Sequence, residues 1–374
     1  MAGIRAGSRE LAVRAAPEYA QSFPLFPSMG EYPIYDDSVY DGFDLPDKRV
    51  RAYRDAVDAA ARGKVVLDIG TGRDALWAIR AAQAGARHVY AIEQQTEAAD
   101  QAARAVAAAG LTDRITVING PSTDVSLPEP AQVCVSEIVG NIASAEGAVP
   151  VLADARKRLC TPDCAWIPFR IQTWAAAVDL SAYELAFATE SLPYLERIFS
   201  AVGRPFDVRL CLGGPVAALP VSTAAAIESI VFDHRRPPPA TDTSTDALLT
   251  VDVPDVSRFA ARPRCSSSAT VTVTGLMLWT RVAVTSAVAE IDTLTDNTRS
   301  WAPVYAPLSL DGIPCRAGDR LAVTFRRAAG DDGLHPDYQV SMVGPDATGE
   351  ALVWSSPHHG GDFRMTDLHR SLFP

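Results

Sequence analysis

The sequence predicts an α/β fold, a doubly wound parallel sheet, followed by an antiparallel β domain. Between about residues 64 and 159, short apolar segments alternate with helical segments, which indicates parallel strands joined by helical crossovers. From about residue 168 onward, β-branched residues alternate with polar ones, and Pro, Gly and Asp separate the segments. The predicted parts are an irregular N-terminal segment at 1–46, the α/β domain at 47–167 and the β domain at 168–374.

The α/β domain is expected to open with a helix over about residues 47–62. Four apolar strands follow, and each of the first two leads into a helix. The predicted order is strand 64–70, helix 74–86, strand 88–93, helix 96–110, strand 115–120, strand 131–137 and helix 149–159.

The β domain contains six segments with the composition of strands. They are 170–180, 247–253, 268–284, 287–294, 319–328 and 337–344. Residues 181–203 show helical spacing instead, so we expect an inserted helical arm that extends to about residue 225. The Pro-rich segment 234–246 is expected to be a stiff polar linker or an exposed loop.

The bulk properties exclude several classes of partner. The net charge of −11 argues against nonspecific binding to nucleic acid or to an anionic membrane. No apolar run reaches the roughly 18 residues of a membrane span, and the N-terminus lacks the apolar core of a signal peptide, so we expect a cytoplasmic protein. Cys160 and Cys164 have no second Cys or His pair nearby, so we expect reduced thiols and no metal site.

A glycine-rich turn follows the first predicted strand. Gly70 and Gly72 permit a tight turn and a close approach of a ligand to the backbone. Glu93, 25 residues after Asp68, ends the next strand, where a carboxylate can bind the hydroxyls of a ribose. Both NAD(P) and S-adenosylmethionine fit this pattern, and Ala75 occupies the place of the third glycine in nicotinamide sites. Asp68 favours S-adenosylmethionine, because a carboxylate can meet a cationic ligand.

Two glutamates flank the loop after the fourth predicted strand. Glu137 and Glu146 stand nine positions apart in a segment that is otherwise small and mostly apolar. A carboxylate at the end of a buried strand is costly unless a partner compensates it. The pair is therefore the strongest candidate for catalytic residues.

Several stretches together resemble the class I methyltransferases of the protein arginine methyltransferase type. They are "VVLDIGTG", "AGARHVYAIE", "ITVINGPSTDVSLP", "VCVSEIVGNIASAEG" and "WIPFR", with a weaker match at "SWAPVYAPLSLDGIPCRAGDRLAVTF". The spacing of the two glutamates is the spacing of that family. The resemblance implies a Rossmann-like methyltransferase domain, a β-barrel domain with an inserted dimerisation arm, and a head-to-tail homodimer.

The resemblance also implies roles for individual residues. Cofactor binding would involve Asp68, Gly70 and Gly72 at the methionine part, Glu93 at the ribose, Arg51 at the carboxylate, and Ser122 and Thr123 at the adenine. The family usually has a carboxylate where Thr123 stands. The substrate pocket would involve Tyr32, Tyr35, Asn141, Ser300 and Trp301.

Two departures from the family concern the acceptor. The family's Thr-His-Trp triplet is replaced by Arg299-Ser300-Trp301, and the residues between the two glutamates are small. We expect the small residues to free volume above the transferred methyl group. This expectation favours a small-molecule acceptor of bacterial secondary metabolism, with methylation of an indole-type ring carbon as the first hypothesis.

Three alternatives remain open at this point. The first is methylation of a guanidino nitrogen of arginine or a peptidyl arginine, held by two carboxylates through charge-assisted bonds. The second is a scaffold that binds S-adenosylmethionine without turnover. The third is a nicotinamide oxidoreductase, which binding of NADH rather than S-adenosylhomocysteine would reveal. The sequence does not indicate which glutamate acts as a base.

Overall fold

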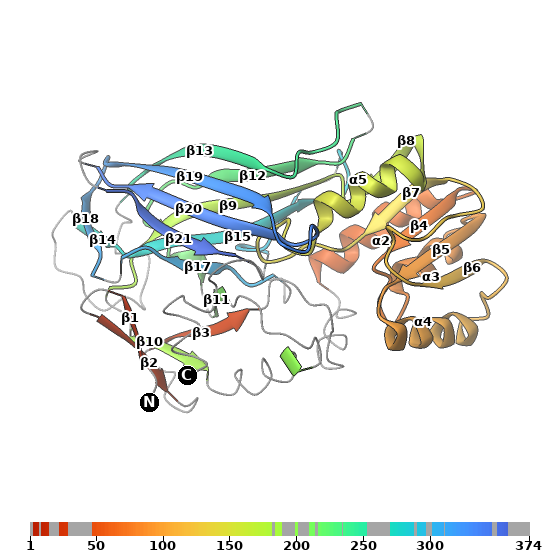
Figure 1. The fold of residues 1–374 in the computed structure, drawn as a ribbon, viewed down its shortest axis with the longest axis horizontal. Helices are drawn as coiled ribbons and strands as arrows, with labels where there is room; N and C mark the ends of the chain where they lie inside the picture. The colour runs from red at the N-terminus through yellow and green to blue at the C-terminus, as the bar shows by residue number, and fades with distance from the viewer. Residues whose placement is uncertain are drawn as a thin grey trace.

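The structure, a computed structural model, has an α/β domain beside a larger β domain (Figure 1). It describes most of the chain between residues 47 and 357, and the backbone of three strands before residue 47. Within those limits, the description leaves out 182–183, 189–198, 201–208, 214–215, 234, 253–269, 288–289, 297–300, 310 and 346–349. No helix in the described part of the chain is long and apolar enough to cross a membrane.

The α/β domain is built on a five-stranded sheet in the order β6-β5-β4-β7-β8, in which every neighbouring pair is parallel. Its strands are β4 (Val65–Ile69), β5 (His88–Glu93), β6 (Ile115–Asn119), β7 (Ala131–Ser136) and β8 (Cys160–Ile167). Its helices are α2 (Lys48–Ala61), α3 (Leu76–Gln83), α4 (Thr96–Ala108) and α5 (Ala148–Arg158). The doubly wound prediction is confirmed.

The strand order explains where a site can form. From β4 the chain moves outward through β5 and β6, and it then crosses to the other side of β4 to form β7. In open α/β sheets, ligands bind outside the carboxyl ends of the strands at such a switch point. Asp68, Glu93 and Glu137 lie at the carboxyl ends of β4, β5 and β7.

One strand of this sheet was not predicted. Strand β8 has the sequence CTPDCAWI, in which Pro162 and Asp163 break any apolar run. The pairing of β7 with β8 contains a register irregularity between Ala131 and Val133. An edge strand accepts proline and an irregular register, because one of its sides needs no sheet partner.

The described residues of the β domain form two large sheets and a small one. One sheet has the order β1-β2-β10-β3-β11-β17-β15-β9-β12, with β16 added on β15; the others are β13-β19-β20-β21 and β14-β18. The strands of this domain are β1 (Gly3–Ala6), β2 (Arg9–Arg14), β3 (Ser22–Ser28), β9 (Arg170–Val178), β10 (Glu184–Ala188), β11 (Arg209–Leu212), β12 (Ala225–Val231), β13 (Thr243–Thr250), β14 (Thr270–Val273), β15 (Gly275–Ala283), β16 (Ile291–Asp292), β17 (Val304–Pro307), β18 (Ile313–Arg316), β19 (Arg320–Ala329), β20 (Pro336–Val343) and β21 (Leu352–Ser356).

The two large sheets share one apolar core. Leu276 and Leu278 of β15 belong to the same buried cluster as Phe325 of β19 and Val340 of β20. Pairing is antiparallel throughout except at β10, which runs parallel to β2 and β3. The predicted order, a Rossmann-like domain followed by an antiparallel β domain, is therefore confirmed.

Two segments of the β domain contain strands that were not predicted there. The expected helical arm at 181–203 contains strand β10 at Glu184–Ala188, and much of its remainder lies outside the described residues. The sequence ELAFA also alternates with period two, so pairing with β2 and β3 decides its structure. The expected loop at 234–246 ends early, because strand β13 begins at Thr243 and pairs with β19.

Candidate active site

Glu137 is held by two side chains from two helices. Its Oε1 atom accepts a hydrogen bond from Nη1 of Arg49 in α2, and its Oε2 atom accepts one from Nε1 of Trp77 in α3 at 2.8 Å. The side chain of Arg49 is only 1% exposed, and that of Glu137 is 17% exposed. The carboxylate at the end of β7 is thus compensated by a buried guanidinium.

The charge of Arg49 is stabilised despite its burial. Burial alone would lower the pKa of Arg49, but the charge and the hydrogen bond of Glu137 raise it, and the net change is upward. Asp47, the N-cap of α2, accepts from the backbone amide of Val50 at 2.9 Å and lies 3.9 Å from Nε of Arg49. The guanidinium of Arg49 therefore remains charged in its buried position beside Glu137.

Arg51, which was predicted to bind the cofactor carboxylate, lies on the exposed side of α2. The buried face of this helix carries Arg49, Tyr53 and Val57, at the spacing of one helix face. Positions 49 and 51 fall on different sides, since a helix turns about 100° per residue. The arginine that reaches the site is Arg49.

Tyr53 is a buried phenol whose pKa responds to both glutamates. Tyr53 is 0% exposed, and its hydroxyl has no hydrogen-bond partner in the described structure. Its ring stacks on Trp77 with the ring centres 5.2 Å apart. Burial raises the pKa of Tyr53 well above its ordinary value, Glu137 and Glu146 raise it further, and Arg49 opposes them. The negative charges of both carboxylates therefore act on one buried hydroxyl.

Glu146 is half-buried and directly precedes the start of α5. The next residue, Gly147, has a φ of 77°, a conformation that favours glycine. A Cβ atom at Gly147 would lie 2.9 Å from the side chain of Leu334, at the tip of the β19–β20 hairpin. The β domain thus contacts the loop right beside the second glutamate.

Glu93 organises the glycine-rich turn. Its Oε2 atom accepts from the backbone amide of Gly72 at 2.9 Å, and its Oε1 atom accepts from that of Gln95 at 3.0 Å. Gly70 and Gly72 have φ values of 73° and 66°. Burial raises the pKa of Glu93, and the backbone hydrogen bonds of Gln95 and Gly72 partly offset this rise.

Asp68 has a buried oxygen in need of a partner. Its Oδ2 atom accepts from the hydroxyl of Thr71 at 2.6 Å, whereas Oδ1 is buried and is bonded by no donor of the described chain. Burial raises the pKa of Asp68 to about 7, and the Thr71 hydroxyl and the nearby backbone amide of Ala78 oppose this rise. A buried acceptor of this kind is usually satisfied by a ligand or an ordered water.

Ser122 and Thr123, the predicted adenine neighbours, differ in exposure. Ser122 is buried, and its backbone oxygen accepts from Nη2 of Arg158 in α5 at 2.9 Å. Thr123 is exposed, and its hydroxyl lies 3.3 Å from a carboxylate oxygen of Asp124. The turn after β6 therefore presents Thr123 to solvent.

The predicted substrate-pocket residues are only partly described. Tyr32, Tyr35 and Ser300 lie outside the described residues. Asn141 donates to Sγ of Cys211 in β11 at 3.2 Å, so its side chain faces the β domain. Trp301 is half-buried and has a φ of 63°, a strained conformation that often occurs at functional sites.

The expectation that small loop residues free volume above the methyl group was wrong. Val139, Ile142, Ala143 and Ala145 are at most 2% exposed. Val139 and Ala143 belong to the core of the α/β domain, and Ile142 and Ala145 belong to that of the β domain. Their size therefore fits the packing between two domains and does not enlarge an acceptor space.

Sequence reasoning missed Arg49, Tyr53 and Trp77. All three lie on helices that flank the sheet, and each has an ordinary helical context in the sequence. The apolar spacing of α2 would have placed Arg49 and Tyr53 on the buried face. The available signal was the spacing of four positions between Arg49 and Tyr53, which places both side chains on the apolar face of the helix.

Comparison with known proteins gives a consistent set of relatives, although no family model matches the chain. Protein arginine N-methyltransferase PRMT10 of Oryza sativa subsp. japonica is 41% identical over 133 residues, 35% of this chain and 34% of that protein. Arginine N(omega)-methyltransferase of Streptomyces achromogenes subsp. streptozoticus is 30% identical over 275 residues, 70% of this chain and 68% of that protein. The chain thus spans about a third of the rice protein and two thirds of the bacterial one.

A solved structure supports the fold. The Trypanosoma brucei PRMT1 enzyme-prozyme heterotetrameric complex with AdoHcy matches with a TM-score of 0.58 and 20% identity. The match covers 83% of this chain and 95% of that chain, so it includes both the α/β domain and the β domain.

Proposed function

This chain belongs to the class I methyltransferases of the protein arginine methyltransferase type, and from that premise we propose that it transfers a methyl group from S-adenosylmethionine to a guanidino nitrogen of arginine. The observation that carries the proposal is the setting of the two glutamates: Glu137 is held at the end of β7 by Arg49 and Trp77, and the half-buried Glu146 closes the same loop just before α5. The bacterial relative named for arginine methylation, which aligns with most of this chain, supports the choice of acceptor.

The described residues fit the cofactor. The unpartnered Oδ1 atom of Asp68 offers an acceptor to a cationic ligand. The turn at Gly70 is too close to Ile138 for a side chain, because a Cβ atom there would lie 3.1 Å from Ile138. We propose that Arg49, rather than the exposed Arg51, faces the cofactor carboxylate, with Glu93 at the ribose. S-adenosylmethionine supplies a methyl group that its positively charged sulfur activates.

The two carboxylates can hold and orient a guanidinium. Both oxygens of Glu137 already accept one hydrogen bond each, but a carboxylate oxygen has room for a second. Charge-assisted bonds to the two glutamates would fix the plane of the guanidinium and localise a lone pair on the reacting nitrogen. Alignment of that nitrogen at about 3 Å from the methyl carbon supplies much of the rate. With S-adenosylmethionine bound, its sulfonium would supply the methyl group and leave as the neutral thioether, and a carboxylate or solvent would take the proton that the methylated nitrogen loses.

Carbon methylation of an indole-type ring is the second candidate. One observation favours it, since Glu137 accepts a hydrogen bond from the indole Nε1 of Trp77 at 2.8 Å. The same carboxylate could accept the N–H of an indole substrate, but the chain's own Trp77 already uses that position. The argument from a larger acceptor space has also lost its basis, because the small loop residues are buried in the two cores.

We also propose that the protein assembles as a homodimer, as its family membership suggests. Light scattering at micromolar concentration tests this assembly. A mass of one chain across the concentration range would reject it.

The acceptor is tested by incubating the purified protein with S-adenosylmethionine and three separate acceptors. These are free L-arginine, an arginine-containing peptide and a tryptophan-derived amide. We expect one added methyl on the guanidino group, which fragmentation by mass spectrometry locates, and the first two arms distinguish free from peptidyl arginine. A methyl on the ring carbon would replace this proposal by the second candidate. Tight binding of S-adenosylmethionine without turnover on any acceptor would leave the scaffold alternative.

A further inference from the structure

A buried carboxylate in the β domain is hydrogen-bonded to the loop between the two glutamates. Glu228 of β12 is 4% exposed, and its Oε1 atom accepts from the hydroxyl of Ser144 at 2.7 Å and from Nη1 of Arg327 in β19 at 2.5 Å. Its Oε2 atom accepts from the hydroxyl of Thr173 in β9 at 2.7 Å. Three donors thus converge on one carboxylate.

The network has a defined direction of donation. Because the Ser144 hydroxyl donates to Glu228, the Tyr338 hydroxyl, 2.7 Å away, must donate to Ser144. The Thr173 hydroxyl likewise donates to Glu228 and accepts from the backbone amide of Ala143 at 3.0 Å. The loop is therefore bonded to Glu228 through Ser144 directly and through Thr173 indirectly.

The other end of the loop is also bonded to the β domain. The hydroxyl of Thr280 in β15 lies 2.8 Å from the backbone oxygen of Gly140 and 3.1 Å from that of Asn141. Residues 140–144 are thus held by side chains of β9, β12, β15 and β20. Glu137 lies just before this anchored segment, and Glu146 lies just after it.

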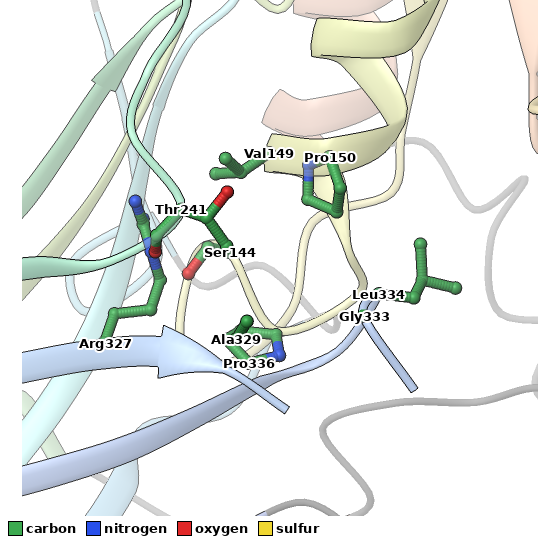
Figure 2. Close-up of a pocket in the computed structure, with 9 residues that line it drawn as sticks. All are labelled: Ser144, Val149, Pro150, Thr241, Arg327, Ala329, Gly333, Leu334 and Pro336. Carbon is green, nitrogen blue, oxygen red and sulfur yellow. The ribbon is translucent and has the colours of Figure 1, made fainter. Parts of the chain in front are cut away.

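Little empty space adjoins the network. A cavity with space for about one water molecule lies beside Ser144 and Arg327 (Figure 2). The residues that line it come from the glutamate loop, the start of α5 and the β domain, and they are Ser144, Val149, Pro150, Thr241, Arg327, Ala329, Gly333, Leu334 and Pro336. The cavity is too small to be the acceptor site.

We propose that Glu228 is a positioning residue, which fixes Glu146 toward the acceptor by holding Ser144 and Ala143. The inference rests on the proposed function and adds a residue of the β domain to it. A buried ion pair such as Glu228–Arg327 adds little stability compared with apolar packing, which favours a role in fixing one geometry. The α/β domain then supplies the cofactor site, while the β domain sets the position of the second carboxylate.

Two variants test the proposal. Ser144→Ala removes one bond of the loop and leaves the Glu228–Arg327 pair in place, whereas Glu228→Gln removes the charge at the centre of the network. Ser229→Ala is the matched control, because Ser229 is the exposed neighbour of Glu228 on the same strand. Three quantities are measured: kcat per folded molecule, the Kd for S-adenosylmethionine, and hydrogen exchange of residues 140–147.

We expect kcat to fall about 10- to 100-fold in Ser144→Ala, the range that a misplaced catalytic group produces. The Kd should change less than about twofold, since Ser144 belongs neither to the glycine-rich turn nor to the strand ends proposed for the cofactor, and the loop amides should exchange faster. A merely structural role would lower Tm without changing kcat per folded molecule or the exchange of the loop, and this result would overturn the proposal. If the wild-type protein transfers no methyl group, the proposed function fails, and the exchange measurement still decides whether Glu228 anchors the loop.

Discussion

Arg49 and Glu137 form an ion pair between residues 88 positions apart in the sequence. The pair joins the helix before the parallel sheet to the loop after its fourth strand. Because Arg49 is almost fully buried, it couples the folding of α2 to the position of a proposed catalytic carboxylate. The first prediction follows from this coupling.

Replacement of Arg49 should affect both stability and cofactor binding. Arg49→Met leaves Glu137 without its guanidinium, so we expect a loss of about 3 kcal/mol in the free energy of unfolding and weaker binding of S-adenosylmethionine. Arg51→Met is the control on the same helix, and its exposed side chain predicts a change of at most about 0.5 kcal/mol. Urea unfolding and calorimetry measure the two effects. Equal behaviour of both variants would contradict the assignment of Arg49.

The two glutamates should be needed for turnover and not for cofactor binding. We expect Glu137→Gln and Glu146→Gln each to lower kcat/KM for arginine by about 10² to 10⁴, the range of positioned acid–base groups. Glu129→Gln, in an exposed pair with Arg87, serves as the control. Steady-state kinetics and cofactor calorimetry separate the two steps. Wild-type turnover in the Glu137→Gln, Glu146→Gln double variant would remove both residues from the mechanism.

Cofactor affinity should rise with pH because of Asp68. Its pKa of about 7 means that the carboxyl is largely neutral at pH 6 and largely ionised at pH 8, and the ionised form binds a cation better. The stability of the ligand-free protein should change in the opposite sense. The folded state binds the extra proton between about pH 4 and pH 7, so this group makes folding less favourable as pH rises through that window.

Both pH effects should disappear in Asp68→Asn. Calorimetry of S-adenosylmethionine binding and thermal unfolding, each at several pH values, provide the measurements. A pH-dependence that persists unchanged in the variant would show that another group titrates.

The hydroxyl of Tyr53 is expected to bind a ligand. In the ligand-free protein, Tyr53→Phe removes a buried polar group without a partner, so the free energy of unfolding should stay the same or rise by about 1 to 3 kcal/mol. Binding or turnover should fall, since the bound state loses a hydrogen bond. Thermal unfolding and kinetics of the same variant measure both effects. A variant that loses stability and keeps full activity would show that the hydroxyl has only a structural partner.

Gly147 should be more sensitive to substitution than a glycine of similar φ. Gly147→Ala combines a φ of 77° with a contact of 2.9 Å to Leu334, whereas Gly110→Ala has a φ of 68° and nothing within 4 Å. Backbone strain alone costs about 1 to 2 kcal/mol, so the control isolates that part. We expect Gly147→Ala to lose more stability and to lower kcat through its neighbour Glu146. Equal losses in both variants would argue against the contact with the β19–β20 hairpin.

The sequence by itself determined the features that depend on local chemistry and order along the chain. Alternating apolar and helical segments predict a parallel sheet. The glycines of the turn mark positions with a positive φ, because other residues rarely adopt that conformation. Asp68, Glu93 and Glu137 lie at or next to the carboxyl ends of buried strands, and the carboxyl ends of parallel strands meet at one edge. Their convergence was therefore predictable before any contact was known.

Only the tertiary structure decided which face of each element is buried and what covers it. Arg49 and Arg51 differ in role because α2 turns one of them toward Glu137, and two arginines so close in sequence look alike. Strand β10 exists because β2 and β3 pair with a segment whose local pattern also suits a helix. The residues of the glutamate loop are small because they pack between two cores. Ser144 is hydrogen-bonded to Glu228 and Tyr338, which follow it by 84 and 194 positions in the sequence. Such long-range contacts leave no periodic signal in the sequence, since each depends on the packing of several elements at once.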